Sequence, residues 1–181
     1  MSLYMVFDVE SVGLHGVGFA VGWVVVDAGA RGAEFAHGMV YTPANAQPGT
    51  PDNHKWVSEN VGDLGMPYRA TRREVRDAFW NAWRYWRAQG AVLCADCPWP
   101  VEANFLAECI RDAPEEREWQ GPYPLIDVAS ARLAVGLDPL GVGERLEGEL
   151  PVHNPEADAR QSARLLLEAL ALLPASAGIG T

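Results

Sequence analysis

The sequence predicts an α/β fold with a mixed sheet, in which three antiparallel strands come first, parallel strands follow, and helices flank the sheet. Two observations predict this fold. Residues 3–42 hold three apolar segments joined by short turns, the pattern of an antiparallel meander. The rest of the chain alternates short apolar segments with longer ones of helical periodicity, the order typical of strands connected by helices.

The predicted strands are apolar runs bounded by turn-forming residues, at 3–9, 17–27, 33–42, 91–96 and 123–128. Segment 43–70 is rich in Pro, Gly, Asn and Asp, so we expect a long irregular loop with a short helical turn around Trp56. Loops of this length are often functional.

The most clearly predicted helix covers 72–88. The capping box Thr71–Glu74 precedes it, and its helically spaced apolar residues predict a core face. The helix also carries five arginines, for which a solvated face is favoured over an RNA contact. The oligomeric state stays open, although the aromatic residues of this helix could pair two subunits in a homodimer. Further helices are expected from Pro100, after Asp127 to about 135, and from Asn154.

Length and composition predict one domain over 1–175 and a short tail at 176–181, because 181 residues with 49% hydrophobic content suffice for a single core. No segment approaches the roughly 20 apolar residues of a membrane span, and the N-terminus lacks a basic region before its apolar run. We therefore expect a cytoplasmic protein with no membrane contact. The odd number of cysteines predicts reduced thiols, and Cys94 and Cys97 are interpreted as buried.

The acidic net charge excludes a protein that binds duplex nucleic acid through a broad positively charged surface. The formal net charge is −10, and Lys55 is the single lysine against 13 arginines. Non-specific binders of the phosphate backbone carry basic stripes. A nucleic-acid substrate must therefore be held locally, which favours short or single-stranded ends.

Asp8 and Glu10 end the first predicted strand. Side chains two residues apart on a strand lie on the same side of the sheet, so the two carboxylates are held close together. Such a pair destabilises the fold unless a cation or a proton compensates the charge. Carboxylate oxygens suit hard divalent cations, and paired metal ions recur in the cleavage of phosphodiesters.

His153 and Asp158 flank the start of the last predicted helix. A histidine just before the helix and an aspartate in its first turns can face the same cleft, and the helix N-terminus favours negative charge there. Each pair alone is weak evidence. Together with Asp8 and Glu10, they predict a metal site with a neighbouring base.

These motifs resemble the DEDDh family of 3′-to-5′ exonucleases, which have a ribonuclease-H-like fold. Residues 7–14 match its first motif as Asp-x-Glu-x-x-Gly-Leu, and residues 153–159 match its third as His-x-x-x-x-Asp-Ala. Ile126-Asp127-Val128 resembles the strand end that precedes the third motif. The resemblance covers nearly the whole chain, and His153 places it on the histidine branch.

The second motif departs from the family pattern. If Phe105-Leu106 is the anchor, Glu102 takes the place of the motif's aspartate, whereas the strand end puts Asp96 near that position. Asp96 is slightly preferred as the fourth acidic ligand because its residue type matches. Glu102 stays open as the alternative, and its simpler interpretation is a first-turn glutamate that the helix dipole favours.

The resemblance implies an enzyme with two Mg²⁺ or Mn²⁺ ions, held by Asp8, Glu10, Asp158 and either Asp96 or Glu102. It implies that His153 is the general base, a role that suits imidazole near neutral pH. The implied products are nucleoside 5′-monophosphates released from the 3′ end of single-stranded RNA or DNA. Short RNA is slightly preferred because this small domain shows no basic track. The expected substrate-binding residues are Ser11, Gly13, Leu14, Trp99 and Asp127.

Leu14 resembles the residue that wedges against the terminal base. For Trp99, stacking on a base and packing in the protein are equally favoured. Two other classes of function compete with an exonuclease. A haloacid-dehalogenase phosphatase needs Asp-x-Asp and a distant lysine, which this chain does not match. A non-catalytic ribonuclease-H-like module that binds nucleic acid or nucleotides is the stronger alternative, because the second motif is degenerate.

Overall fold

The computed structural model describes residues 2–30, 32–65 and 67–173. The predicted tail at 176–181 lies outside the described residues. The strands are β1 (Leu3–Ser11), β2 (Gly18–Asp27), β3 (Ala33–Tyr41), β4 (Val92–Ala95) and β5 (Leu125–Asp127). The α-helices are α1 (Pro51–Asn60), α2 (Arg72–Ala88), α3 (Val101–Arg111), α4 (Pro114–Arg117), α5 (Val128–Ala134) and α6 (Pro155–Ala171). Short 3₁₀ turns are η1 (Ala28–Ala30), η2 (Ala44–Ala46) and η3 (Glu147–Glu149).

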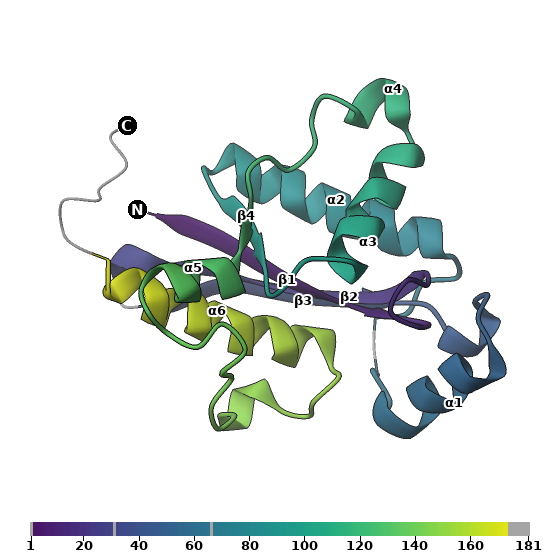
Figure 1. Cartoon of the computed structure of the whole chain (residues 1–181). Helices are drawn as coiled ribbons and strands as arrows, with labels where there is room; N and C mark the ends of the chain where they lie inside the picture. Colours follow the sequence, from purple (N-terminus) through teal and green to yellow (C-terminus); the bar gives the residue numbers. More distant parts are fainter. Residues whose placement is uncertain (1, 31, 66, 174–181) are drawn as a thin grey trace.

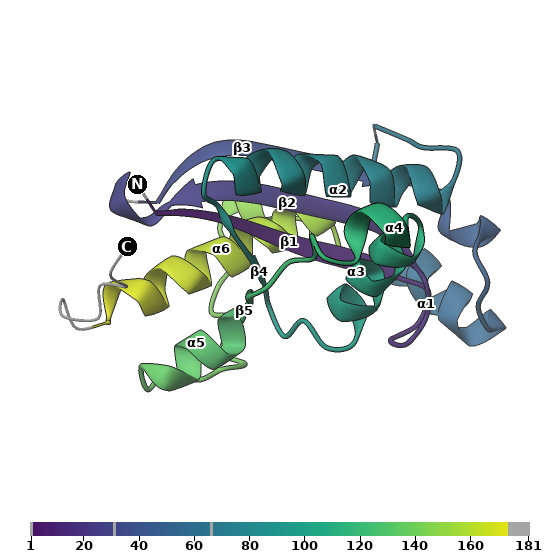
Figure 2. The same ribbon diagram turned by 90° about the horizontal axis from the view of Figure 1, so that it is seen from above.

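The five strands form one mixed sheet in the order β3-β2-β1-β4-β5. The pairs β1–β2 and β2–β3 are antiparallel, whereas β1–β4 and β4–β5 are parallel. Helices α2 and α3 cover one face of the sheet and α6 covers the other, while α1 lies beside the turn between β1 and β2 (Figures 1 and 2). The predicted α/β fold, with its antiparallel strands first and parallel strands after them, is confirmed.

The core has a separate layer on each face of the sheet. On the α2 and α3 side, Phe79 packs against Phe7 and Phe105, with ring centroids 4.9 and 5.5 Å apart. On the α6 side, Val6 packs with Leu165 and Leu166. Burying each large apolar side chain contributes about 1.5–3 kcal/mol to folding, so both layers fix the helices on the sheet.

Helix α2 begins and ends where the sequence predicts, and Thr71 and Glu74 form the predicted capping box. Phe79 and Trp83 are buried, which confirms the core face. The solvated-face interpretation is wrong for Arg76. This side chain is buried. Its charge is compensated by two carboxylates at the end of α3, Glu108 at 2.9 Å and Asp112 at 2.5 Å.

Two local predictions need correction. Segment 43–70 contains a full helix, α1, where only a turn was expected. Thr50 caps this helix and Pro51 starts it, but Val57 is its one buried residue in the described structure, so no apolar periodicity marks it. The second correction concerns the thiols: Cys94 is buried as predicted, whereas Cys97 is exposed in a left-handed backbone conformation just after β4.

Candidate active site

Strand β1 carries Asp8 and Glu10 toward α6. Along this strand, Met5 and Phe7 face the core layer under α2 and α3, whereas Val6 faces the layer under α6. Because side chains alternate along a strand, Asp8 and Glu10 continue the row of Val6. Glu10 is buried, and Asp8 is partly buried.

The N-terminus of α6 lies directly on the sheet because Gly22 leaves room for it. Gly22 pairs with Asp8 across β1 and β2, and a methyl group at Gly22 would overlap the backbone of Pro155 and Glu156. The side chain of Asn154 caps the helix by accepting hydrogen bonds from two backbone N–H groups, both at 3.1 Å. This packing brings the first turn of α6 next to β1.

Three side chains from β1, from α6 and from the residue just before the α6 cap converge. Glu10, His153 and Asp158 each offer a ligand atom, and these atoms lie within 4.8 Å of one another. The distance between His153 Nδ1 and Glu10 Oε1 is 3.7 Å. His153 has a φ of 62°, a conformation that costs a residue other than glycine about 1–3 kcal/mol, and its ring meets Trp56 of α1 edge-on at 5.0 Å.

Glu102 and Asp96 add two further carboxylates near Asp8. Glu102, in the first turn of α3, is 6% exposed and accepts a hydrogen bond from the backbone N–H of Val9 at 3.3 Å. Asp96 follows β4, and its Oδ1 is buried without a hydrogen-bond partner among the described residues. Both carboxylates therefore lie near Asp8, and Glu102 is the one tied to β1.

The carboxylates raise one another's pKa values. Burial raises the pKa of Asp8 well above its ordinary value, and the nearby charge of Glu102 is the next cause. Burial and then Asp158 raise the pKa of Glu10 to about 7. Burial raises the pKa of Glu102 to about 8, although the hydrogen bond from Val9 opposes this shift. Such a cluster favours bound protons or bound cations.

A cavity of about 790 Å³ opens over these carboxylates, and we call it the carboxylate cavity. Nearly all predicted site residues line it, namely Asp8, Glu10, Ser11, Gly13, Leu14, Asp96, Trp99, Glu102, His153 and Asp158. Asp127 is not among its lining residues. It caps α5 instead, where its carboxylate accepts hydrogen bonds from Ala129 N at 3.0 Å and from the Ser130 hydroxyl.

Several lining residues were not predicted from the sequence. Trp56 and Asn53 come from α1, and Arg145 comes from the segment between α5 and α6. The Thr50-Pro51 cap was the signal that could have revealed α1. Arg145 had no such signal, because its segment has neither a motif nor an apolar period.

Exposed apolar side chains surround the cavity. Leu14 is 65% exposed, Trp99 74% and Trp56 45%. Flat or branched apolar surfaces beside a polar cleft can pack against nucleobases, and base stacking contributes about 1–3 kcal/mol per base. The exposure of Trp99 excludes the core-packing interpretation for this residue.

The donor set fits a divalent cation. Glu10 and Asp158 supply carboxylate oxygens, and His153 supplies an imidazole nitrogen close to them. In addition, Asp96 Oδ1 is a buried acceptor without a donor among the described residues. Oxygen-rich sites of this kind suit Mg²⁺ and Mn²⁺.

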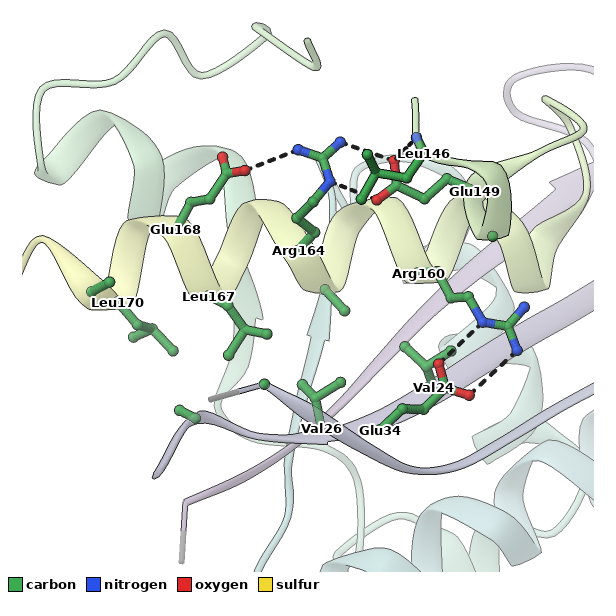
Figure 3. A pocket seen from close by; sticks show the side chains of 15 residues that line it. Val24, Val26, Glu34, Leu146, Glu149, Arg160, Arg164, Leu167, Glu168 and Leu170 are labelled. Atoms are coloured by element: carbon green, nitrogen blue, oxygen red, sulfur yellow. Dashed lines mark hydrogen bonds and ion pairs between the residues drawn. The ribbon is translucent and has the colours of Figure 1, made fainter. Parts of the chain in front are cut away.

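A second hollow lies between α6 and the β2–β3 edge of the sheet (Figure 3). Its charged side chains pair with one another. Arg160 binds Glu34 at 3.1 Å, and Arg164 binds Glu149 at 2.5 Å. Because these charges are already matched and the remaining lining is mainly aliphatic, the hollow offers no comparable chemistry.

Three solved structures that this chain resembles in fold are exonucleases. The zinc-bound complex of E. coli ExoI with ssDNA aligns with a TM-score of 0.62 and 12% identity over 97% of this chain. The nuclease domain of 3′hExo, a DEDDh family member bound to rAMP, aligns with a TM-score of 0.51 and 10% identity over 94% of this chain and 92% of its own. The chain has the ribonuclease-H-like fold of the DEDDh exonucleases.

Exonuclease I from Methylocaldum szegediense also has a similar fold, with a TM-score of 0.57 and 15% identity over 92% of this chain. The chain spans 42% of the E. coli ExoI chain and 40% of the Methylocaldum one. No protein-family model matches the sequence, and no curated protein is significantly similar to it. Among the described residues, no helix is long and apolar enough to cross a membrane.

Proposed function

We propose that the chain is a metal-dependent 3′-to-5′ exonuclease that acts on single-stranded nucleic acid and releases nucleoside 5′-monophosphates. The observation that carries the proposal is the convergence of Glu10, His153 and Asp158 beside Asp8, within a DEDDh fold. These are the residue types that the first and third motifs of that family require.

Asp8, Glu10, Asp158 and Glu102 are proposed as the cation ligands. Glu102 is preferred to Asp96 as the fourth, because it is buried, bonded to β1, and the carboxylate that most strongly raises the pKa of Asp8. Two bound Mg²⁺ or Mn²⁺ ions would activate the attacking water and neutralise charge on the departing 3′ oxygen.

His153 is proposed to accept the proton of the attacking water. Its ring lies at the cavity edge, partly exposed, with Glu10 on one side and Trp56 on the other. This placement fixes the ring without burying it, as a general base that exchanges protons with solvent requires.

The proposed substrate is a short single strand, with RNA slightly preferred, and the proposed location is the cytoplasm. Leu14, Trp56 and Trp99 offer apolar surfaces for the terminal bases around the cavity. The net charge of −10 supports a substrate held at its end and not along a basic track.

The test uses 3′-labelled RNA and DNA single strands with Mn²⁺. Wild type is expected to release the label, and Asp8→Asn to reduce release by at least about 100-fold, since even partners of metal ligands are worth about 10–100-fold. Asp63→Asn is the matched control, because it removes an exposed carboxylate charge that does not line the carboxylate cavity. EDTA is expected to stop release in every active protein.

Equal release by wild type and Asp8→Asn would contradict the proposed site. Strand binding without any release by wild type, on either nucleic acid, would favour the non-catalytic binding module.

A further inference from the structure

Arg145 is the sole lysine or arginine among the described residues that line the carboxylate cavity. Its side chain is 21% exposed. One guanidinium nitrogen, Nη1, donates to Asp158 Oδ1 and to the backbone carbonyl of Glu149, the latter at 2.8 Å. Its remaining N–H groups have no hydrogen-bond partner within the described residues.

The segment that carries Arg145 is fixed to α6. The buried carboxylate of Glu149 accepts hydrogen bonds from Arg164 at 2.5 and 2.9 Å and from the backbone N–H of Leu146 at 3.1 Å (Figure 3). The carbonyl of the same Glu149 holds the guanidinium of Arg145. Arg145 is therefore anchored at the cavity and is not a freely moving surface side chain.

Two negatively charged groups, the carboxylate of Asp158 and a phosphodiester of the substrate, need the positive charge of this guanidinium. Asp158 lies in an acidic cavity, where burial raises its pKa and the ion pair with Arg145 opposes that rise. A phosphodiester that enters the same cavity adds further negative charge. The planar guanidinium binds carboxylates and phosphates through the same fork of donors.

We infer that Arg145 is a phosphate-binding residue that pairs with Asp158 in the cation-free site and with the scissile phosphate in the loaded one. This inference rests on the proposed function. A cation and the guanidinium compete for the carboxylate of Asp158, so cation binding frees the guanidinium for the phosphate beside it. One residue thereby links cation loading to substrate binding.

The first measurement uses Mn²⁺ alone, without nucleic acid. Arg145→Gln is expected to lower, several-fold, the Mn²⁺ concentration that gives half of the maximal thermal stabilisation, because the competitor for Asp158 is gone. Arg160→Gln, which removes an α6 arginine outside the cavity, is expected to match wild type.

The second measurement compares binding of a nucleoside 5′-monophosphate with binding of the nucleoside itself, both in Mn²⁺. Wild type is expected to prefer the monophosphate, and Arg145→Gln to reduce this preference by about 10-fold or more, the loss expected for a charge-assisted contact. Arg145→Lys keeps the charge without the fork and is expected to fall between the two. Arg160→Gln again serves as the control.

An unchanged monophosphate preference in Arg145→Gln, or a higher Mn²⁺ requirement, would overturn the inference. If wild type still cleaves single strands in that case, the proposed exonuclease function is retained and only the inference about Arg145 is rejected. If wild type neither cleaves strands nor distinguishes the monophosphate from the nucleoside, both the proposed function and the inference about Arg145 are rejected.

Discussion

Glu102 and Asp96 illustrate what single residues contribute to the site. We predict that Glu102→Gln reduces Mn²⁺-dependent cleavage by more than about 100-fold, beyond the loss typical of residues that only support a ligand. Asp96→Asn is predicted to lose less, because Asp96 has no hydrogen bond to β1 among the described residues and its charge raises the pKa of Asp8 less than that of Glu102 does. Steady-state rates of the two variants, at matched protein stability, provide the measurement. A larger loss in Asp96→Asn would assign the fourth ligand to Asp96.

The carboxylates also predict how stability depends on pH. An unfolded glutamate releases its proton near pH 4.5, whereas folded Glu10 holds it to about pH 7 and folded Glu102 to about pH 8. The folded state therefore binds more protons in this window, so the cation-free protein loses stability as the pH rises from about 5 to about 8. The loss from Glu10 alone is roughly 3 kcal/mol, at about 1.4 kcal/mol per tenfold change in proton affinity.

Denaturation in EDTA across this pH range measures the effect. Glu102→Gln is expected to flatten the dependence of stability on pH, and Asp63→Asn, which removes an exposed carboxylate outside the cluster, to leave it unchanged. Stability that rises with pH in the wild type would show that the cluster does not hold its protons.

At the scale of elements, the contact between β2 and α6 assembles the site. Gly22→Ala is predicted to destabilise the protein by about 1–3 kcal/mol, because the added methyl group overlaps the backbone at the start of α6. For a chain of this size, the melting temperature falls by about 2–4 °C per kcal/mol. The variant should also gain less thermal stability from Mn²⁺, since α6 carries Asp158.

Gly62→Ala is the control, because a methyl group there meets nothing within 4 Å. A Gly22→Ala protein as stable as Gly62→Ala, with the same response to Mn²⁺, would contradict the role of this contact.

The elements that carry the site differ in how far the sequence predicts them. Strand β1 and helix α6 are predictable because apolar runs and caps mark their ends, so Asp8 and Asp158 were assigned to the correct elements. Helix α1 was missed because it buries Val57 alone. The choice between Asp96 and Glu102 needs the register of α3 against β1, which is a tertiary contact. Arg145 was missed because its contact with Asp158 depends on a loop.

For the whole molecule, the acidic charge and the DEDDh fold together define the central claim. A chain with a net charge of −10 does not hold nucleic acid through general electrostatics. The proposed function therefore requires recognition at the carboxylate cavity, where the proposed cations, Arg145 and three exposed apolar side chains would meet one strand end. This arrangement predicts removal of nucleotides from one end, in one direction.

The polarity of degradation tests this claim most directly. A single strand labelled at its 5′ end is incubated with the protein and Mn²⁺, either with a free 3′ hydroxyl or with the 3′ end held in a duplex. We predict a ladder that shortens from the free 3′ end, release of nucleoside 5′-monophosphates, and no ladder from the protected end. Internal cuts, or loss of the 5′ label as the first product, would contradict the account.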